Sequence, residues 1–116
     1  MFSPTVLFDD TLSVKNVYTA FVAHRKKDFD FKGESHNFWE LVYINSGTVG
    51  ITSGGKALEC KTGTAVLHKP GEFHSIWSVG GTEPVYTVLT FDIKGQKQDR
   101  LKGLAVNLSS EGIEIM

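Results

Sequence analysis

The chain has 116 residues, of which 41% are hydrophobic, and 12 basic against 13 acidic residues give a net charge of −1. These values are typical of one globular domain, and they exclude the strongly basic surface that nonspecific nucleic-acid binding needs. No apolar run is long enough to cross a bilayer, and Met1-Phe2-Ser3-Pro4 lacks the pattern of a secretory signal. Cys60 is the single cysteine, which excludes an internal disulfide and favours a reducing, cytoplasmic setting.

Short runs rich in β-branched and aromatic residues, separated by turns, predict strands along most of the chain. Turns centred on glycine, such as Ser53-Gly54-Gly55, end several of these runs. This rhythm predicts an all-β sandwich or barrel. The predicted strands are Leu12–Val22, Phe29–Phe31, Phe38–Ile44, Thr48–Thr52, Lys56–Cys60, Thr64–His68, Phe73–Val79, Val85–Ile93 and Ala105–Leu108.

The chain from Gln96 onward has a different pattern. Ser109, Ser110 and Glu111 predict the start of a helix, because serine caps the first amide groups and an acid is favourable at the positive end of the helix dipole. A helix with so few residues is unstable alone. We therefore expect a barrel over residues 1–95, and a tail over 96–116 that leads towards further sequence.

Polar and apolar residues alternate around Glu34 to Val42. In a continuous strand, alternate side chains point to the same side. One face would then carry Glu34, His36, Phe38, Glu40 and Val42. Such a face is either exposed to solvent or part of a polar pocket, whereas the opposite face with Trp39, Leu41 and Tyr43 is apolar.

A second polar stretch surrounds His74. Pro70 and Gly71 predict a turn, after which His74, Ile76 and Ser78 share a face of the next strand. A lone histidine in such a position is more often structural than functional, so the stretch gains meaning only together with the first one.

The first stretch resembles the first sequence motif of the cupin family. His36, three residues, Glu40, six residues and Gly47 match the second half of that motif, while Glu34 stands where its first histidine is found. The run from His36 to Gly47 is also similar to the opening of the effector-sensing domain of AraC-type transcription regulators.

The second stretch resembles the second cupin motif. Gly63, Gly71 and His74 have its spacing, while Lys69 replaces a proline and Ser78 replaces an asparagine. The resemblance covers residues 12 to 94, and the joint spacing of the two motifs makes it more specific than either motif alone.

The resemblance implies a cupin double-stranded β-helix, a jelly-roll barrel with an effector pocket inside. The protein would be a homodimeric AraC-type regulator of transcription that senses a sugar or similar small molecule. It would contact DNA through a helix-turn-helix region that this chain lacks. The predicted pocket residues are Glu34, His36, Phe38, Glu40, Val42, His74, Ile76 and Arg25.

A stand-alone metal-dependent cupin enzyme, of the isomerase or dioxygenase type, is the alternative, and other binding or storage cupins are a third class. Imidazole and carboxylate ligands suit Zn²⁺, Mn²⁺ and Fe²⁺. The residues available for such a site are Glu34, His36, Glu40 and His74. Because Glu34 breaks the histidine pair of the motif, we expect no resident cofactor and no catalytic residue.

Several further residues have two interpretations. Arg25 ends the first long strand, where it is either exposed or able to clamp a carboxylate or sugar hydroxyls. Trp39, Tyr43 and Trp77 are expected in the core rather than stacked on a sugar, and Cys60 is expected to pack as an apolar residue. His68 is expected at the rim or surface.

Overall fold

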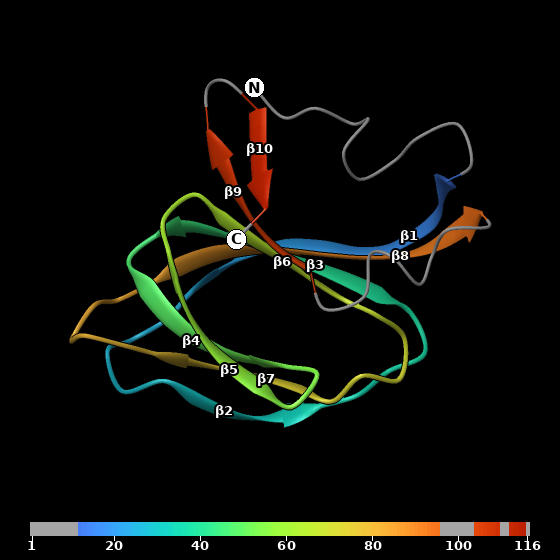
Figure 1. The fold of residues 1–116 in the computed structure, drawn as a ribbon. Helices are drawn as coiled ribbons and strands as arrows, with labels where there is room; N and C mark the ends of the chain where they lie inside the picture. The colour runs from blue at the N-terminus through green and yellow to red at the C-terminus, as the bar shows by residue number, and fades with distance from the viewer. Residues whose placement is uncertain (1–11, 96–103, 110–111, 116) are drawn as a thin grey trace.

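The computed structural model describes residues 12–95, 104–109 and 112–115, in which every regular element is a β-strand (Figure 1). The prediction of an all-β chain is confirmed, and each predicted strand is found with its ends shifted by a few residues. The described strands are β1 (Leu12–His24), β2 (Asp30–Glu34), β3 (Trp39–Ser46), β4 (Thr48–Ser53), β5 (Lys56–Lys61), β6 (Thr64–His68), β7 (His74–Ser78), β8 (Val85–Gly95), β9 (Leu104–Ser109) and β10 (Gly112–Ile115).

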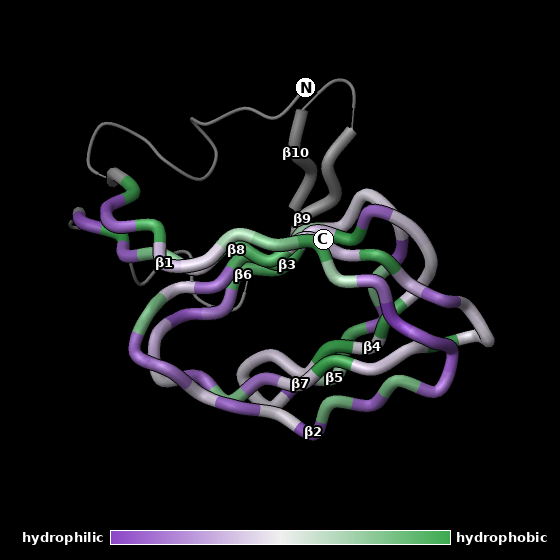
Figure 2. The backbone as a smooth tube through the Cα atoms, turned by 180° about the vertical axis from the view of Figure 1, so that it is seen from behind, coloured by the Kyte–Doolittle hydropathy of each residue, from purple (hydrophilic) through white to green (hydrophobic). Residues whose placement is uncertain are grey.

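The strands form two antiparallel sheets that face each other as two layers (Figure 1; Figure 2). The larger sheet has the order β1-β8-β3-β6-β9-β10, and the smaller has the order β2-β7-β4-β5. Many neighbours in a sheet are distant in the sequence, as where Phe21 of β1 lies opposite Val88 of β8. The space between the sheets is lined by residues from each of β1 to β8.

The hairpin between β4 and β5 shows how a local sequence ends a strand. Its two connecting residues, Gly54 and Gly55, have φ angles of 57° and 80°. Two consecutive positive φ angles define the turn whose twist matches that of paired strands, and glycine adopts them without steric cost. The Ser53-Gly54-Gly55 turn predicted from the sequence is thus confirmed.

Apolar side chains from both sheets fill much of the space between the layers. This cluster consists of Ala23, Val42, Ile44, Val49, Ile51, Cys60, Val66, Tyr86 and Val88. Cys60 is only 2% exposed, as expected for a cysteine that packs as an apolar residue, and burial raises the pKa of its thiol. The other face of the larger sheet carries a second cluster with Trp39, Leu67, Phe91 and Ile93, so the core position predicted for Trp39 is confirmed.

The helix predicted from Ser109 is wrong. Ser109 ends β9, which pairs with β6, and Gly112–Ile115 forms β10 beside β9, while residues 110 and 111 lie outside the described part of the chain. The residues Ile113, Glu114 and Ile115 alternate between apolar and polar with the period of a strand. Pairing with β9 provides backbone hydrogen bonds, whereas a helix this short is unstable alone. The larger sheet thus continues into the segment that the sequence assigned to a tail.

Gly50 on β4 gives a test of the packing between strands. An added Cβ at this position would overlap the ring of Trp77 on the neighbouring β7. We expect Gly50→Ala to lower the free energy of unfolding by about 1–3 kcal/mol, as overpacking commonly does. Urea unfolding measures this value, and Glu59→Ala at the exposed position opposite Gly50 on β5 is the control. Equal stability of both variants and the unmodified chain would contradict the prediction.

Candidate functional site

A cavity of about 380 Å³ lies between the two sheets. This volume is within the range of small-molecule binding sites. Its wall is largely apolar, with a group of carboxylate and imidazole side chains on one part and a guanidinium on another. The lining residues are Phe21, Arg25, Phe29, Phe31, Glu34, Glu40, Val42, Ile51, His68, His74, Ser75, Ile76, Tyr86 and Val88.

The polar group of the cavity is assembled from both sheets. Glu34 is the last residue of β2 in the smaller sheet, whereas Glu40 belongs to β3 in the larger sheet. The strand that would have placed their side chains on one face by alternation is not continuous, because residues 35–38 connect the two sheets. The two carboxylates therefore lie close together because the chain crosses from one sheet to the other between them. The single strand face expected from the sequence does not form.

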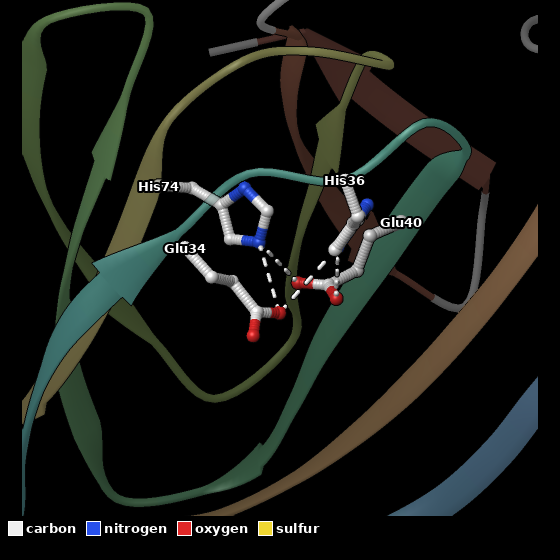
Figure 3. Close-up of side chains that lie close together, drawn as sticks. All are labelled: Glu34, His36, Glu40 and His74. Atoms are coloured by element: carbon white, nitrogen blue, oxygen red, sulfur yellow. Dashed lines mark hydrogen bonds and ion pairs between the residues drawn. The ribbon is translucent and has the colours of Figure 1, made fainter.

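Four side chains converge at this point (Figure 3). The carboxylate of Glu40 lies between two imidazoles, with Oε1 3.2 Å from His36 Nε2 and Oε2 3.3 Å from His74 Nε2. Glu34 Oε2 is 3.5 Å from His36 Nε2 and 3.7 Å from His74 Nε2. His74 Nε2 is buried and makes no hydrogen bond of good geometry, so its contacts here are electrostatic.

Charge on Glu40 and His74 is mutually stabilising. Burial alone would raise the pKa of Glu40, but the contact with His74 and the neighbouring imidazoles outweigh it and lower that pKa below its usual value. Burial alone would lower the pKa of His74, but the contact with Glu40 outweighs it and raises that pKa. The pair is therefore ionic over a wider pH range than either residue would be alone.

A second polar group lies behind the first and was not predicted. His68 is 1% exposed on the cavity wall, so its expected position at the rim or surface is wrong. Its Nδ1 lies 3.2 Å from Glu72 Oε1, and Ser53 Oγ donates to the same oxygen at 2.7 Å. His68 also stacks on His74, with ring centroids 4.3 Å apart.

The two stacked imidazoles differ in basicity. Burial and the charge of His74 lower the pKa of His68, and its contact with Glu72 offsets this only in part. His74, whose pKa is raised, takes up a proton first. His68 is therefore the neutral partner near neutral pH, and the Glu72 carboxylate favours the proton on Nδ1. This arrangement leaves Nε2 as the hydrogen-bond acceptor of the ring.

Arg25 occupies another part of the wall. Its Nε donates to the hydroxyl of Tyr86 at 3.0 Å, and its guanidinium carbon lies 4.4 Å from the centre of the Phe29 ring. Within the described part of the chain no carboxylate forms an ion pair with Arg25. An aromatic setting thus holds the guanidinium at the cavity without neutralising it.

Six of the eight residues predicted to form the pocket line the cavity, namely Arg25, Glu34, Glu40, Val42, His74 and Ile76. His36 and Phe38 are not on its wall. Their rings stack on each other at 4.0 Å, and Phe38 packs beside Tyr18. Glu72 was not predicted as a site residue, although the sequence carried a signal for it. It follows His68 by four residues in the polar stretch Pro70-Gly71-Glu72-Phe73-His74. The aromatic wall residues had no comparable signal.

The donor set of the first polar group fits a divalent metal. One ligand atom from each of Glu34, His36, Glu40 and His74 can be chosen so that all four lie within 4.8 Å of one another. The buried Nε2 of His74 without a good hydrogen bond is the atom that such an ion would use. Two imidazoles and two carboxylates are common ligands of Zn²⁺, Mn²⁺ and Fe²⁺.

Comparison with solved structures identifies the type of barrel. A predicted oxalate decarboxylase from Thermotoga maritima has a TM-score of 0.62 and 18% identity over 78% of this chain and 75% of its own. An RmlC-like cupin from Shewanella frigidimarina has a TM-score of 0.58 and 15% identity over 80% of this chain and 74% of its own. At these identities the likeness concerns the fold alone, which is the cupin double-stranded β-helix predicted from the sequence.

A third structure belongs to a larger protein. ToxT from Vibrio cholerae, solved with an unsaturated fatty acid bound, has a TM-score of 0.53 and 17% identity over 69% of this chain. The matched region is 31% of the ToxT chain. No curated protein sequence gives a significant match.

The family model described as the AraC-like ligand binding domain matches residues 16–95. The chain therefore belongs to this family, and the resemblance to the sensing domain of AraC-type regulators is confirmed. No helix in the described residues is long and apolar enough to span a membrane.

The Glu40–His74 pair has a defined pH dependence. The raised pKa of His74 stabilises the folded state fully when the pH is below 6.5, the ordinary histidine pKa. This stabilisation is lost as the pH rises through the pKa of His74 in the folded state. The lowered pKa of Glu40 stabilises the folded state fully when the pH is above 4.5, the ordinary glutamate pKa. This stabilisation is lost as the pH falls through the pKa of Glu40 in the folded state. The pair therefore stabilises the fold fully between these two ordinary values.

We expect Glu40→Gln to lower the pKa of His74, because the contact that raises it is removed. NMR titration of the histidine ring protons in the presence of a chelator measures this, and Glu59→Gln at an exposed position is the control. In a double-mutant cycle with His74→Gln, we expect a coupling of about 0.5–3 kcal/mol near pH 5.5 that shrinks at pH 8. An unchanged His74 titration would contradict the assignment.

Proposed function

We propose that this chain is the small-molecule effector-sensing domain of an AraC-type transcription regulator, and that the effector binds in the cavity between the sheets. The observation that carries the proposal is this cavity, inside a domain whose family is the AraC-like ligand binding domain. The fatty acid bound to ToxT supports a small molecule as the kind of ligand. The sugar or similar effector expected from the sequence stays a prediction.

Binding in the cavity would act by shifting the population between different arrangements of the two sheets. A ligand that fits one arrangement of the two sheets better than another favours it by the difference in binding free energy. Because Glu40 and His74 come from different sheets, a ligand beside them contacts both layers at once. Such a contact would couple occupancy to the relative position of the sheets.

DNA contact is proposed for a helix-turn-helix region outside these residues. The net charge of −1 and the absence of helices among the described residues support a barrel that does not bind DNA itself.

A homodimer stays a prediction. On β1, the edge strand of the larger sheet, Val17 and Val22 are 61% and 54% exposed, which makes this strand the place where a second copy would be sought.

A variant that fills the cavity tests the proposal. We expect Ile76→Phe, on the cavity wall, to weaken effector binding at least tenfold, because the added ring occupies ligand volume. A thermal-shift screen of pooled metabolites finds ligands, since a ligand that binds only the folded state raises Tm. Isothermal titration calorimetry then compares the variant with the unmodified chain.

Leu41→Phe is the matched control, because Leu41 packs on the other face of the larger sheet. It adds a similar volume outside the cavity and should leave affinity within about twofold. A ligand that binds both variants equally would place the site elsewhere. A screen in which no pooled metabolite raises Tm would count against a sensor.

A metal-dependent cupin enzyme is the second candidate, and the four converging donors favour it. Glu34, His36, Glu40 and His74 would hold the ion, which would supply Lewis-acid chemistry to a substrate in the cavity. We expect protein purified without metal-affinity resin to contain well under one metal ion per chain by elemental analysis. A stoichiometric ion that is lost in His74→Gln, and activity that depends on it, would favour the enzyme instead.

A further inference from the structure

The cavity joins two chemically different ends through an apolar middle. Arg25 contacts Tyr86, which lies opposite Ile44 in the larger sheet, whereas Glu40 lies opposite Thr90. Tyr86 and Thr90 are four residues apart on β8, which corresponds to about 13 Å along a strand. The strand positions beside which the cationic end and the carboxylate–imidazole end lie are thus set apart by roughly the length of a small elongated molecule.

Most of the wall between these ends offers no hydrogen bond. It consists of Phe21, Phe29, Phe31, Val42, Ile51, Ile76 and Val88. A sugar carries hydroxyl groups around its whole ring, and each one buried without a partner costs free energy. An aromatic or aliphatic body gains free energy against the same wall. The wall therefore favours a ligand whose polar groups are confined to its ends.

The Arg25 end favours a carboxylate. The guanidinium is fixed by the Tyr86 hydroxyl and the Phe29 ring, and no described carboxylate pairs with it. A planar guanidinium held in this way presents its outer N–H groups as a fork that matches a carboxylate in two hydrogen bonds. Phe21 and Phe31 on the cavity wall are 47% and 36% exposed, so apolar rings of the wall are in contact with solvent.

The opposite end favours a hydrogen-bond donor. Carboxylate oxygens of Glu34 and Glu40 accept hydrogen bonds, and the ring of His68 leaves Nε2 as an acceptor. A hydroxyl or amino group would donate to these atoms, whereas a second carboxylate would meet the two like charges of Glu34 and Glu40, of which protonated His74 offsets only one. The cavity thus distinguishes the two ends of an asymmetric ligand.

We propose that the effector is an elongated amphipathic carboxylic acid. Its carboxylate binds Arg25, its apolar body lies against the phenylalanine and aliphatic wall, and a hydroxyl or amino group at its far end binds near Glu40 and His74. This inference rests on the proposed function, because it names the ligand class of the same cavity. This ligand class, with an acid at one end and a hydrogen-bond donor at the other, differs from the sugar expected from the sequence.

A panel of defined probes tests the ligand class. It contains 4-hydroxyphenylalkanoates and ω-aminoalkanoates of increasing chain length, their methyl esters, the phenylalkanoates without the hydroxyl group, and neutral monosaccharides. Binding to the 116-residue chain is measured by thermal shift and calorimetry. We expect at least one hydroxy or amino acid to bind, and its ester and its analogue without the donor group to bind at least tenfold more weakly.

Three variants locate the carboxylate. Arg25→Gln should weaken the acid at least tenfold and abolish the preference for acid over ester, because the charged fork is gone. Lys26→Gln removes a neighbouring exposed charge that does not line the cavity, and it should leave affinity within twofold. Urea unfolding of each variant shows whether the fold is retained. Arg25→Lys, which keeps the charge but not the fork, should give an intermediate affinity.

The outcomes separate this inference from the proposed function. Monosaccharides that bind and lose affinity in Ile76→Phe, with no binding of the acids, would overturn the ligand class and leave the sensor in place. Equal binding of acid and ester, or an acid affinity unchanged in Arg25→Gln, would also overturn it. Binding by no probe of the panel overturns the class, and the metabolite screen then decides on the sensor independently.

Discussion

The contact between Glu40 and His74 is the interaction around which the cavity is organised. Removing a carboxylate from water is costly unless an opposite charge or hydrogen bonds compensate, and Glu40 is only 8% exposed. Its compensation comes from His74, which belongs to the other sheet. The pair therefore requires the two layers to stay at a fixed separation near this point. Apolar packing of residues such as Val49 and Val66 holds the layers together nearby, and the unfilled space between these features is the cavity.

The histidines on and beside the cavity wall have different roles because their surroundings differ. His74 faces carboxylates and gains proton affinity, whereas His68 is buried beside a charged neighbour and loses it. Glu72, held by Ser53, orients His68 from behind. His36 lies outside the cavity wall and stabilises the other side of the Glu40 carboxylate. A change at Glu40 would consequently alter the protonation of more than one ring.

The same barrel serves binding proteins and enzymes, so the fold leaves the function open and the site has to decide it. Among the structures with a similar fold are a predicted oxalate decarboxylase and ToxT. In this chain a glutamate at position 34 occupies the place of a motif histidine, and Arg25, which has no carboxylate partner among the described residues, lines a largely apolar wall. These particular residues are the basis on which we propose recognition of a molecule with distinct ends rather than a metal-centred reaction.

The sequence by itself determined the all-β class, the positions of β1 to β9 along the chain and the two polar stretches, because alternation and glycine turns are local properties of a chain. It also indicated the family, since the spacing from His36 to Gly47 is local too. Only the tertiary structure decided that residues 35–38 cross between sheets, that His68 is buried on the cavity wall, and that Arg25 meets Phe29 and Tyr86 there. The predicted helix at Ser109 failed because Gly112–Ile115 pairs with β9 instead, and β9 is itself held by pairing with the distant strand β6. Contacts between strands remote in the sequence leave no local pattern, and the cavity is built from such contacts.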